Sequence, residues 1–239
     1  MPLNLADKFF VRLFLFTLTL TSLCFAQPKP ESLSFDIKMV FPGENTYDGK
    51  INQKVKSNGN IIRDFKVYNN GSVLGESTEL FDGNYNFIGA RKKDIRCDKD
   101  QIIKFDGNIA HLVQNGDRED VSIKSGVTFG TGFFDKTRDA IAPGFLGQQF
   151  DIFVLVPEKS DWFTVKTAKI ENINYNGIQA VKLTIVAKSF IVRLFTDEAI
   201  FIYDTSEQHK PLEYTGILPF LDKKCDVVGN GKIIFKEVK

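Results

Sequence analysis

The sequence has 239 residues and a balanced charge, with 31 basic and 30 acidic residues giving a formal net charge of +1 at neutral pH. Charged residues are interspersed and form no blocks, so nothing in the composition favours nucleic acid, an anionic membrane or another polyelectrolyte as a partner. A chain of this length can bury roughly 70% of its unfolded surface. It therefore needs no metal in order to fold, and we expect no cofactor.

The N-terminus carries the pattern of an export signal. Lys8 and Arg12 precede an apolar run over residues 13–23, and small residues follow at the two positions that signal peptidase reads. We therefore expect residues 1–26 to be a signal peptide, whose removal takes away two basic residues and one acidic residue and leaves a formal charge of zero. The apolar run is too short to span a bilayer comfortably, which needs about 20 residues. An uncleaved anchor and lipidation of Cys24 are the alternatives.

Export would place the chain in the periplasm or outside the cell, where thiols can oxidise. Two cysteines remain after cleavage, Cys97 and Cys225. We expect a disulfide between them, which would contribute about 4–5 kcal/mol in the chain-entropy view because it closes a long loop. Two separate buried thiols are the alternative, and the spacing shows no Cys-x-x-Cys redox or zinc signature.

The first half of the remaining chain alternates extended runs with turn signals. Phe35, Ile37 and Met39 form an inward stripe on the first run, and Asn-Gly or Asp-Gly pairs separate several of the later runs. Such pairs supply the positive φ angles of tight hairpin turns. The rhythm predicts an antiparallel up-and-down sheet, with a polar loop over residues 45–50. The expected strands span residues 35–41, 51–56, 60–68, 73–81, 85–96, 101–105, 108–114 and 120–124.

The segment from Ser125 to Gln149 breaks this pattern. It carries five glycines among apolar residues, which predicts a long apolar loop with a short helix near residues 136–141. Long loops in compact domains are commonly functional or mobile, so we interpret the segment as a lid over the sheet. The alternative is a plug that closes one end of the sheet and has no further role.

The second half is organised around a long β-hairpin. Residues 161–175 and 178–195 read as two strands joined by Asn176-Gly177, a pair suited to a type I′ turn. Beyond Val186 apolar residues fall on both faces of the strand, so both faces should be covered, by protein or by a ligand. Further strands are expected at residues 152–156, at 198–204, from 211 onward and at 232–238.

These observations predict an all-β protein with a single β domain over residues 27–239. We expect one strongly curved antiparallel sheet that forms a half-open barrel, with the 125–149 segment as a loop and short-helix lid. A β-sandwich is the alternative. The abundant phenylalanines suit a two-layer core, but in a sheet that curls without closing they would line an apolar trough.

Catalytic and metal-binding signatures are not found in the sequence. The two histidines, His111 and His209, are far apart and lack zinc-site spacing, and no Gly-x-Ser-x-Gly nucleophile elbow occurs. Gly130-Thr131-Gly132 lacks the further glycine and lysine of a phosphate-binding loop. We therefore expect a non-enzymatic protein. A hydrolase with a carboxylate pair that spacing cannot reveal remains an alternative.

Residues of the second half resemble the closing part of an uncharacterised family of exported bacterial half-barrel proteins. The resemblance rests on Glu171, Tyr175, Gly177, Ala180, Lys182 and Leu183, followed by Ile202-Tyr203-Asp204 and Pro211-Leu212-Glu213-Tyr214. The family is similar in build to the lipoprotein-carrier (LolA-like) proteins, and this likeness implies a curved antiparallel sheet that holds acyl chains against a helical lid. It covers about the last ninety residues.

The predicted function is a periplasmic binding or carrier protein for a hydrophobic ligand, such as a lipid or a lipoprotein acyl chain. An envelope scaffold or protein-interaction module is the main alternative. The expected partner is thus a hydrophobic small molecule, with an envelope protein as a second possibility and no nucleic acid. The residues expected to line the site are Phe129, Phe133, Phe134, Phe145 and Leu146 of the lid, with Trp162, Phe190, Val192 and Leu194 of the sheet. If the opposite face of the strand over residues 178–195 points inward, Ile191 and Phe195 take the place of Val192 and Leu194.

Overall fold

A computed structural model describes residues 30–41, 46–139, 141, 150–157, 160–189, 197–221 and 228–238. Within these residues, fifteen strands belong to one sheet. The first eight are β1 (Leu33–Val40), β2 (Thr46–Val55), β3 (Ile61–Asn69), β4 (Ser72–Phe81), β5 (Phe87–Asp94), β6 (Lys99–Asp106), β7 (Ile109–Gln114) and β8 (Asp117–Ser122). The others are β9 (Val127–Thr128), β10 (Asp151–Val156), β11 (Asp161–Tyr175), β12 (Ile178–Ala187), β13 (Ala199–Asp204), β14 (Pro211–Leu221) and β15 (Val228–Glu237), with helix α2 (Gly132–Asp139) between β9 and β10.

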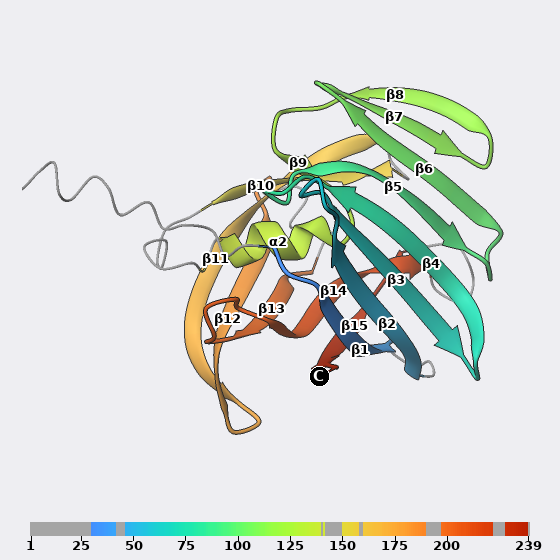
Figure 1. Cartoon of the computed structure of the whole chain (residues 1–239). Coiled ribbons are helices and arrows are strands. Elements are labelled where there is room, and N and C mark those ends of the chain that lie inside the picture. Colours follow the sequence, from blue (N-terminus) through green and yellow to red (C-terminus); the bar gives the residue numbers. More distant parts are fainter. Residues whose placement is uncertain are drawn as a thin grey trace, which may run out of the picture.

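The sheet consists of two meanders joined at its middle. Strands β1 to β8 follow one another outward in one direction, and β15 back to β9 follow one another in the other, with β1 and β15 as the shared centre. All neighbouring pairs are antiparallel except β9 with β10, which is parallel. The strands curl around α2, which lies within the concave side (Figure 1). This confirms the expected curved half-barrel, because the strands form one continuous sheet and not the two packed sheets of a β-sandwich.

Side-chain alternation explains why the sheet curls around an interior. On β1, Phe35, Ile37 and Met39 are buried while Asp36 and Lys38 are exposed, so one face of the strand is apolar and the other is wet. The same alternation recurs on β2 and β3. The predicted Asn176-Gly177 turn is also present, with φ angles of 51° and 85°, as a type I′ turn requires.

Two local expectations were wrong. Residues 46–50 belong to β2 and are not a loop, because Tyr47 and Gly49 point inward between polar neighbours that face water. The short helix spans Gly132–Asp139, earlier than residues 136–141. The glycines around its start suggested a loop, yet Gly132 packs so closely on Phe81 that a Cβ atom would lie 2.7 Å from the ring.

The interior contains two clusters of buried apolar side chains. The first cluster lies between the central strands β1–β3 and the strands β12–β15, and it includes Phe35, Ile37, Phe65, Leu183, Phe201, Tyr214, Ile233 and Phe235. The second cluster lies under β3–β8 and β10, and it includes Ile61, Phe81, Phe87, Leu112, Phe129 and Leu155. Strand β3 contributes to both, with Ile61 in the second and Phe65 in the first.

The two ends of the sheet approach each other without pairing as strands. Strands β8 and β9 stand at opposite ends of the strand order, but side chains near them form hydrogen bonds. Trp162 Nε1 donates to the Ser122 carbonyl oxygen over 3.1 Å, and Gln114 Nε2 donates to the Pro157 carbonyl oxygen over 2.8 Å. These side-chain contacts, which we call the seam, link the ends of the sheet where no backbone ladder does.

No helix within the described residues combines the length and the apolar character needed to cross a bilayer.

The seam predicts the effect of changing Trp162. Trp162→Phe keeps the ring against Phe153, whose centroid lies 5.6 Å away, but removes the indole donor to Ser122. We expect a loss of about 1 kcal/mol in the free energy of unfolding, the usual net value of one hydrogen bond. Trp162 is the single tryptophan, so unfolding should be followed by circular dichroism. An unchanged stability would show that the seam does not hold the ends of the sheet together.

Candidate functional site

Helix α2 occupies the concave face of the sheet through two aromatic side chains. The Phe133 ring lies 5.1 Å from that of Phe201, and the Phe134 ring lies 5.4–5.5 Å from those of Phe201, Tyr214 and Phe235, all in edge-on geometry. Such pairs contribute about 0.5–1.5 kcal/mol each beyond the area that they bury. The helix thereby covers the apolar surface of the first cluster.

A buried ion pair fastens this helix to the sheet. Arg63 of β3 and Asp135 of α2 form a bidentate pair, with Nη1 to Oδ2 at 2.9 Å and Nη2 to Oδ1 at 3.1 Å. Arg63 Nη1 also donates to the Thr131 carbonyl and hydroxyl oxygens, over 3.1 and 2.9 Å. Arg63 is 7% exposed and Asp135 is 3% exposed. Both charges are therefore almost fully removed from water and depend on each other.

The surroundings of Arg63 complete its hydrogen bonding and keep it charged. Its Nε donates to Gln53 Oε1 over 3.1 Å, and its guanidinium carbon lies 5.0 Å from the centre of the Phe81 ring. Gln53 in turn donates to the Tyr85 hydroxyl over 3.2 Å. Burial alone would lower the pKa of Arg63, but the charge and hydrogen bonds of Asp135 outweigh it and raise the pKa. The guanidinium thus stays protonated inside the barrel.

Glu79 of β4 is a second buried charged residue beneath the helix. Its carboxylate accepts the backbone N–H of Thr131 at 3.0 and 3.2 Å and also the Thr131 hydroxyl. Gly130 has a φ of +55°, and a Cβ there would lie 2.2 Å from Glu79 Oε1. Gly130-Thr131-Gly132 therefore binds the carboxylate of Glu79 and is not a phosphate-binding loop. Burial raises the pKa of Glu79.

A third polar tie joins the middle of the helix to β13. The Thr137 hydroxyl and the Tyr203 hydroxyl are 2.5 Å apart, and Tyr203 also donates to the Phe134 carbonyl oxygen over 3.0 Å. Tyr203 is 1% exposed, and burial raises the pKa of its phenol. Helix α2 is thus held by polar groups from β3, β4 and β13 while its aromatic residues rest on apolar ones.

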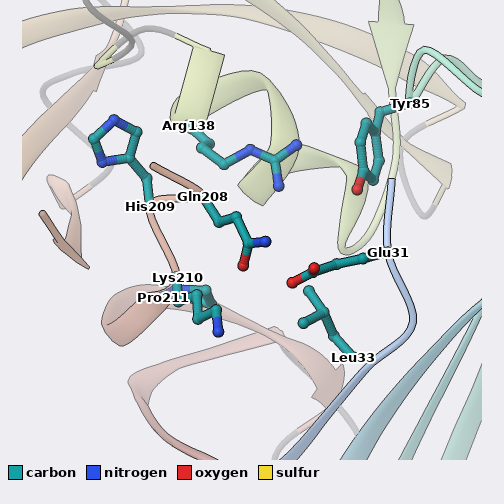
Figure 2. A pocket seen from close by; sticks show the side chains of 8 residues that line it. All are labelled: Glu31, Leu33, Tyr85, Arg138, Gln208, His209, Lys210 and Pro211. Carbon is teal, nitrogen blue, oxygen red and sulfur yellow. The ribbon is translucent and has the colours of Figure 1, made fainter. Parts of the chain in front are cut away.

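Two small cavities adjoin the helix. The larger, about 60 Å³, is lined by Leu33, Phe35, Ile51, Gln53, Arg63, Thr131, Phe134, Asp135, Arg138, Tyr203, His209, Pro211 and Phe235. The smaller, about 30 Å³, is lined by the residues drawn in Figure 2. Pockets that enclose drug-sized ligands measure about 300–1,000 Å³. With α2 in place, these cavities can hold waters or a small polar group but not an acyl chain.

The predicted lining residues that the structure describes belong to two different apolar clusters. Phe133 and Phe134 lie together on α2 against the first cluster, whereas Phe129 and Trp162 pack in the second cluster. The other predicted lining residues, Phe145, Leu146, Phe190, Val192 and Leu194, lie outside the described residues. That these residues form one ligand-binding surface stays a prediction.

The polar fastening of the helix escaped the sequence analysis, although a signal for it exists. Arg63 stands between Ile61 and Phe65 on the inward side of β3, and Glu79 stands between Ser77 and Phe81 on the inward side of β4. A charged residue at an inward position of a strand is unusual, because an unpaired buried charge is strongly unfavourable. Their inward position on the strands would have indicated that each residue pairs with another buried group.

Catalytic and metal-binding arrangements are not evident in the described part of the chain. It contains no group of three or more His, Cys, Asp or Glu side chains placed to hold a metal. His111 pairs with the exposed Asp120, with Nδ1 to Oδ1 at 2.7 Å. Burial raises the pKa values of the carboxyl groups of Glu79 and Asp139, but neither residue lines the two cavities beside α2.

Cys97 takes part in a disulfide. Cys225 lies outside the described residues, so the pairing of Cys97 with Cys225 stays a prediction.

The buried ion pair predicts large effects of single substitutions. Arg63→Met and Asp135→Leu should each lower the free energy of unfolding by about 3–5 kcal/mol, because each leaves a buried charge without its partner. The double variant should lose far less than the sum of the two. Chemical denaturation checks this, with Arg91→Met as the control. Arg91 forms an exposed pair with Asp100 at 2.8 Å, whose loss should change the stability far less because water screens exposed ion pairs. Additive losses in the double variant would contradict the pairing.

The raised pKa of Glu79 predicts how stability changes with pH. The folded state holds this proton more tightly than the unfolded chain does, so the contribution is favourable below the ordinary value of 4.5 and is lost as pH rises through the raised pKa. Glu79→Gln cannot ionise, so its stability relative to the natural chain should increase with pH above about 4.5. Denaturation at several pH values tests this, with Glu76→Gln, a partly exposed position on the same strand, as the control. Parallel pH profiles for Glu79→Gln and the natural chain would refute the assignment.

Comparison with known proteins supports the fold. No family model matches the chain, and no curated protein matches its sequence. Among solved structures, the chain is similar to a β-barrel-like protein of a domain of unknown function, DUF1849, from Brucella abortus, with a TM-score of 0.50 and 10% identity over 89% of this chain and 97% of that one. A domain from Vibrio parahaemolyticus named for outer membrane lipoprotein sorting matches with a TM-score of 0.26 and 5% identity over 87% and 83%, which is too low to carry an argument. The expected likeness to half-barrel proteins is thus confirmed as a likeness of fold.

Proposed function

We propose that this chain is an exported, non-enzymatic protein that binds and carries a hydrophobic molecule, such as a lipid or a lipoprotein acyl chain, on the concave face of its half-barrel. The observation that carries the proposal is the way α2 is held. Its aromatic side chains cover an apolar face, while its fastening consists of buried charged and polar groups.

The surface beneath the helix suits an apolar ligand. The side chains that Phe133 and Phe134 contact, Phe201, Tyr214 and Phe235, are all buried and belong to neighbouring strands of the second meander. Phe133 and Phe134 themselves are only partly buried. If the helix left, the surface formed by these side chains would be a continuous apolar trough. An acyl chain could then make the apolar contacts that the two phenylalanine rings make now.

The fastening suits a helix that leaves and returns. Buried ion pairs add little net stability compared with apolar contacts of the same volume, because both charges lose their hydration. When α2 moves away, Arg63 and Glu79 regain water, which offsets part of the lost attraction. An apolar ligand can then supply the remaining free energy through the surface that it buries, about 0.8 kcal/mol for each CH₂ group.

Two further features support export and the periplasm as the working compartment. The N-terminal pattern is that of a signal peptide, and Cys97 takes part in a disulfide, a bond that persists mainly in oxidising compartments. The described residues that border the two cavities beside α2 do not include a nucleophile and base in catalytic arrangement, which favours binding over catalysis.

The proposal is tested by purifying the protein from its own host under native conditions, followed by native mass spectrometry and organic extraction. We expect a lipid to copurify with it. A titration with a fluorescent fatty acid should show saturable binding, and Phe134→Ala should tighten it by at least about tenfold, because weaker plugging raises the binding-competent population. Phe105→Ala, which removes a ring packed 4.7 Å from Phe87 in the second cluster, is the matched control and should leave binding unchanged.

The contrary outcome is equally clear. No copurifying lipid, no probe binding by either variant and a stoichiometric protein partner in cellular cross-linking would replace the carrier with an envelope scaffold.

A further inference from the structure

The two cavities beside α2 meet at one cationic side chain. Arg138, on the last turn of the helix, lines both of them, together with Leu33, His209 and Pro211. The larger cavity extends inward to Phe35, Ile51 and Phe235 of the first cluster. The smaller is bordered mostly by polar side chains, and Figure 2 shows Arg138, Glu31 and Gln208 converging on it. The joint space therefore has an apolar inner end and a polar end.

Arg138 has hydrogen-bonding capacity that its neighbours do not use. Its Nε atom is buried and has no hydrogen-bond acceptor among the described residues. Its guanidinium stacks over the Tyr85 ring, 4.6 Å from the centroid. The Asp135 carboxylate approaches at 3.6 Å, but both of its oxygens already accept the shorter bonds from Arg63. A buried donor of a charged group is unfavourable without an acceptor. Nε is therefore a donor to which an oxygen of a ligand could bind.

The charge around this position leaves room for a negative group. Both oxygens of Asp135 are engaged by Arg63, and neither Glu79 nor Asp139 lines either cavity. At the polar end, Lys210 Nζ is held by Glu237 at 2.6 Å, and the Glu31 carboxylate is the one acidic side chain among the residues of the smaller cavity. An incoming anion would meet Arg138 as its main partner and Glu31 as its competitor.

We propose that Arg138 binds the oxyanion head group, a carboxylate or a phosphate, of an amphiphile, and keeps this contact when the apolar chain displaces Phe133 and Phe134 and α2 loosens from the concave face of the sheet. This inference rests on the proposed carrier function and specifies the ligand class. Guanidinium groups bind carboxylate and phosphate through charge-assisted hydrogen bonds, which are about twice as strong as neutral ones. A cavity of about 60 Å³ accepts such a head group, and its apolar inner end leads the chain toward Phe35 and Phe235.

The experiment compares dodecanoate, dodecanol and the free anions acetate and phosphate by isothermal titration calorimetry on the full predicted mature chain. Dodecanoate should bind at least about tenfold more tightly than dodecanol. Arg138→Met should abolish that difference by weakening dodecanoate alone, and Arg138→Lys should keep part of it. Glu31→Gln should strengthen dodecanoate several-fold, because it removes the competing charge. Lys136→Met, on the same helix but outside both cavities, is the matched control and should change neither affinity.

The outcomes separate the two proposals. Equal affinity for dodecanoate and dodecanol, unaffected by Arg138→Met, would overturn the head-group site and leave the carrier standing. Absence of binding by both would overturn both. Binding of acetate or phosphate as tightly as dodecanoate, still dependent on Arg138, would assign the cavity to a free anion and not to an amphiphile. Circular dichroism of each variant confirms that a lost affinity does not reflect unfolding.

Discussion

The arrangement of this protein depends on one buried guanidinium. Arg63 lies on β3 between Ile61, which belongs to the second apolar cluster, and Phe65, which belongs to the first. From there it binds Asp135 of α2, so the same residue separates two cores and fixes the helix that covers one of them. An apolar residue at position 63 could merge the clusters, but it could not define where the helix sits. In some proteins, buried polar or charged groups favour one unique arrangement at a cost in stability, and we infer this role for Arg63.

The single sheet makes this arrangement possible. A sheet that closed through a backbone ladder would leave a space set by its strand number and tilt. Here the ends of the sheet are joined through side chains at the seam, and a short helix fills what the strands do not. The interior is thus divided between a part filled by residues of the strands and their connections and a part covered by α2, the element that we propose a ligand displaces. A ligand could enter the second part without disturbing the first.

Much of the fold could be predicted from the sequence, for local reasons. Asn176-Gly177 fixes a hairpin with two residues, and the inward stripe of β1 is visible as simple alternation. The boundary of β2 was missed because its outward residues are polar, so that Tyr47 alone carried little signal. The start of α2 was missed because Gly132 is disfavoured in helices, and its reason for being there, contact with Phe81, lies far away in sequence.

The candidate site was less predictable than the fold for the same reason. Arg63, Glu79 and Asp135 come from three separate elements and Thr131 from the turn before α2, and nothing in their spacing marks them as a group. Only the inward positions of Arg63 and Glu79 on their strands indicated that they are buried, and such a position does not identify a partner. The phenylalanines of α2 were visible as an apolar, glycine-rich segment, and their place over the first cluster followed only from the three-dimensional structure.

We propose that α2 is a displaceable cover and not a permanent part of the core. Hydrogen–deuterium exchange measured over residues 132–139, with and without saturating dodecanoate, tests this most directly. We expect the amides of α2 to exchange faster when the ligand is bound, while those of β1 and β15 at the centre of the sheet remain protected. Helix amides as protected as those of β1 and β15 in both conditions would contradict it.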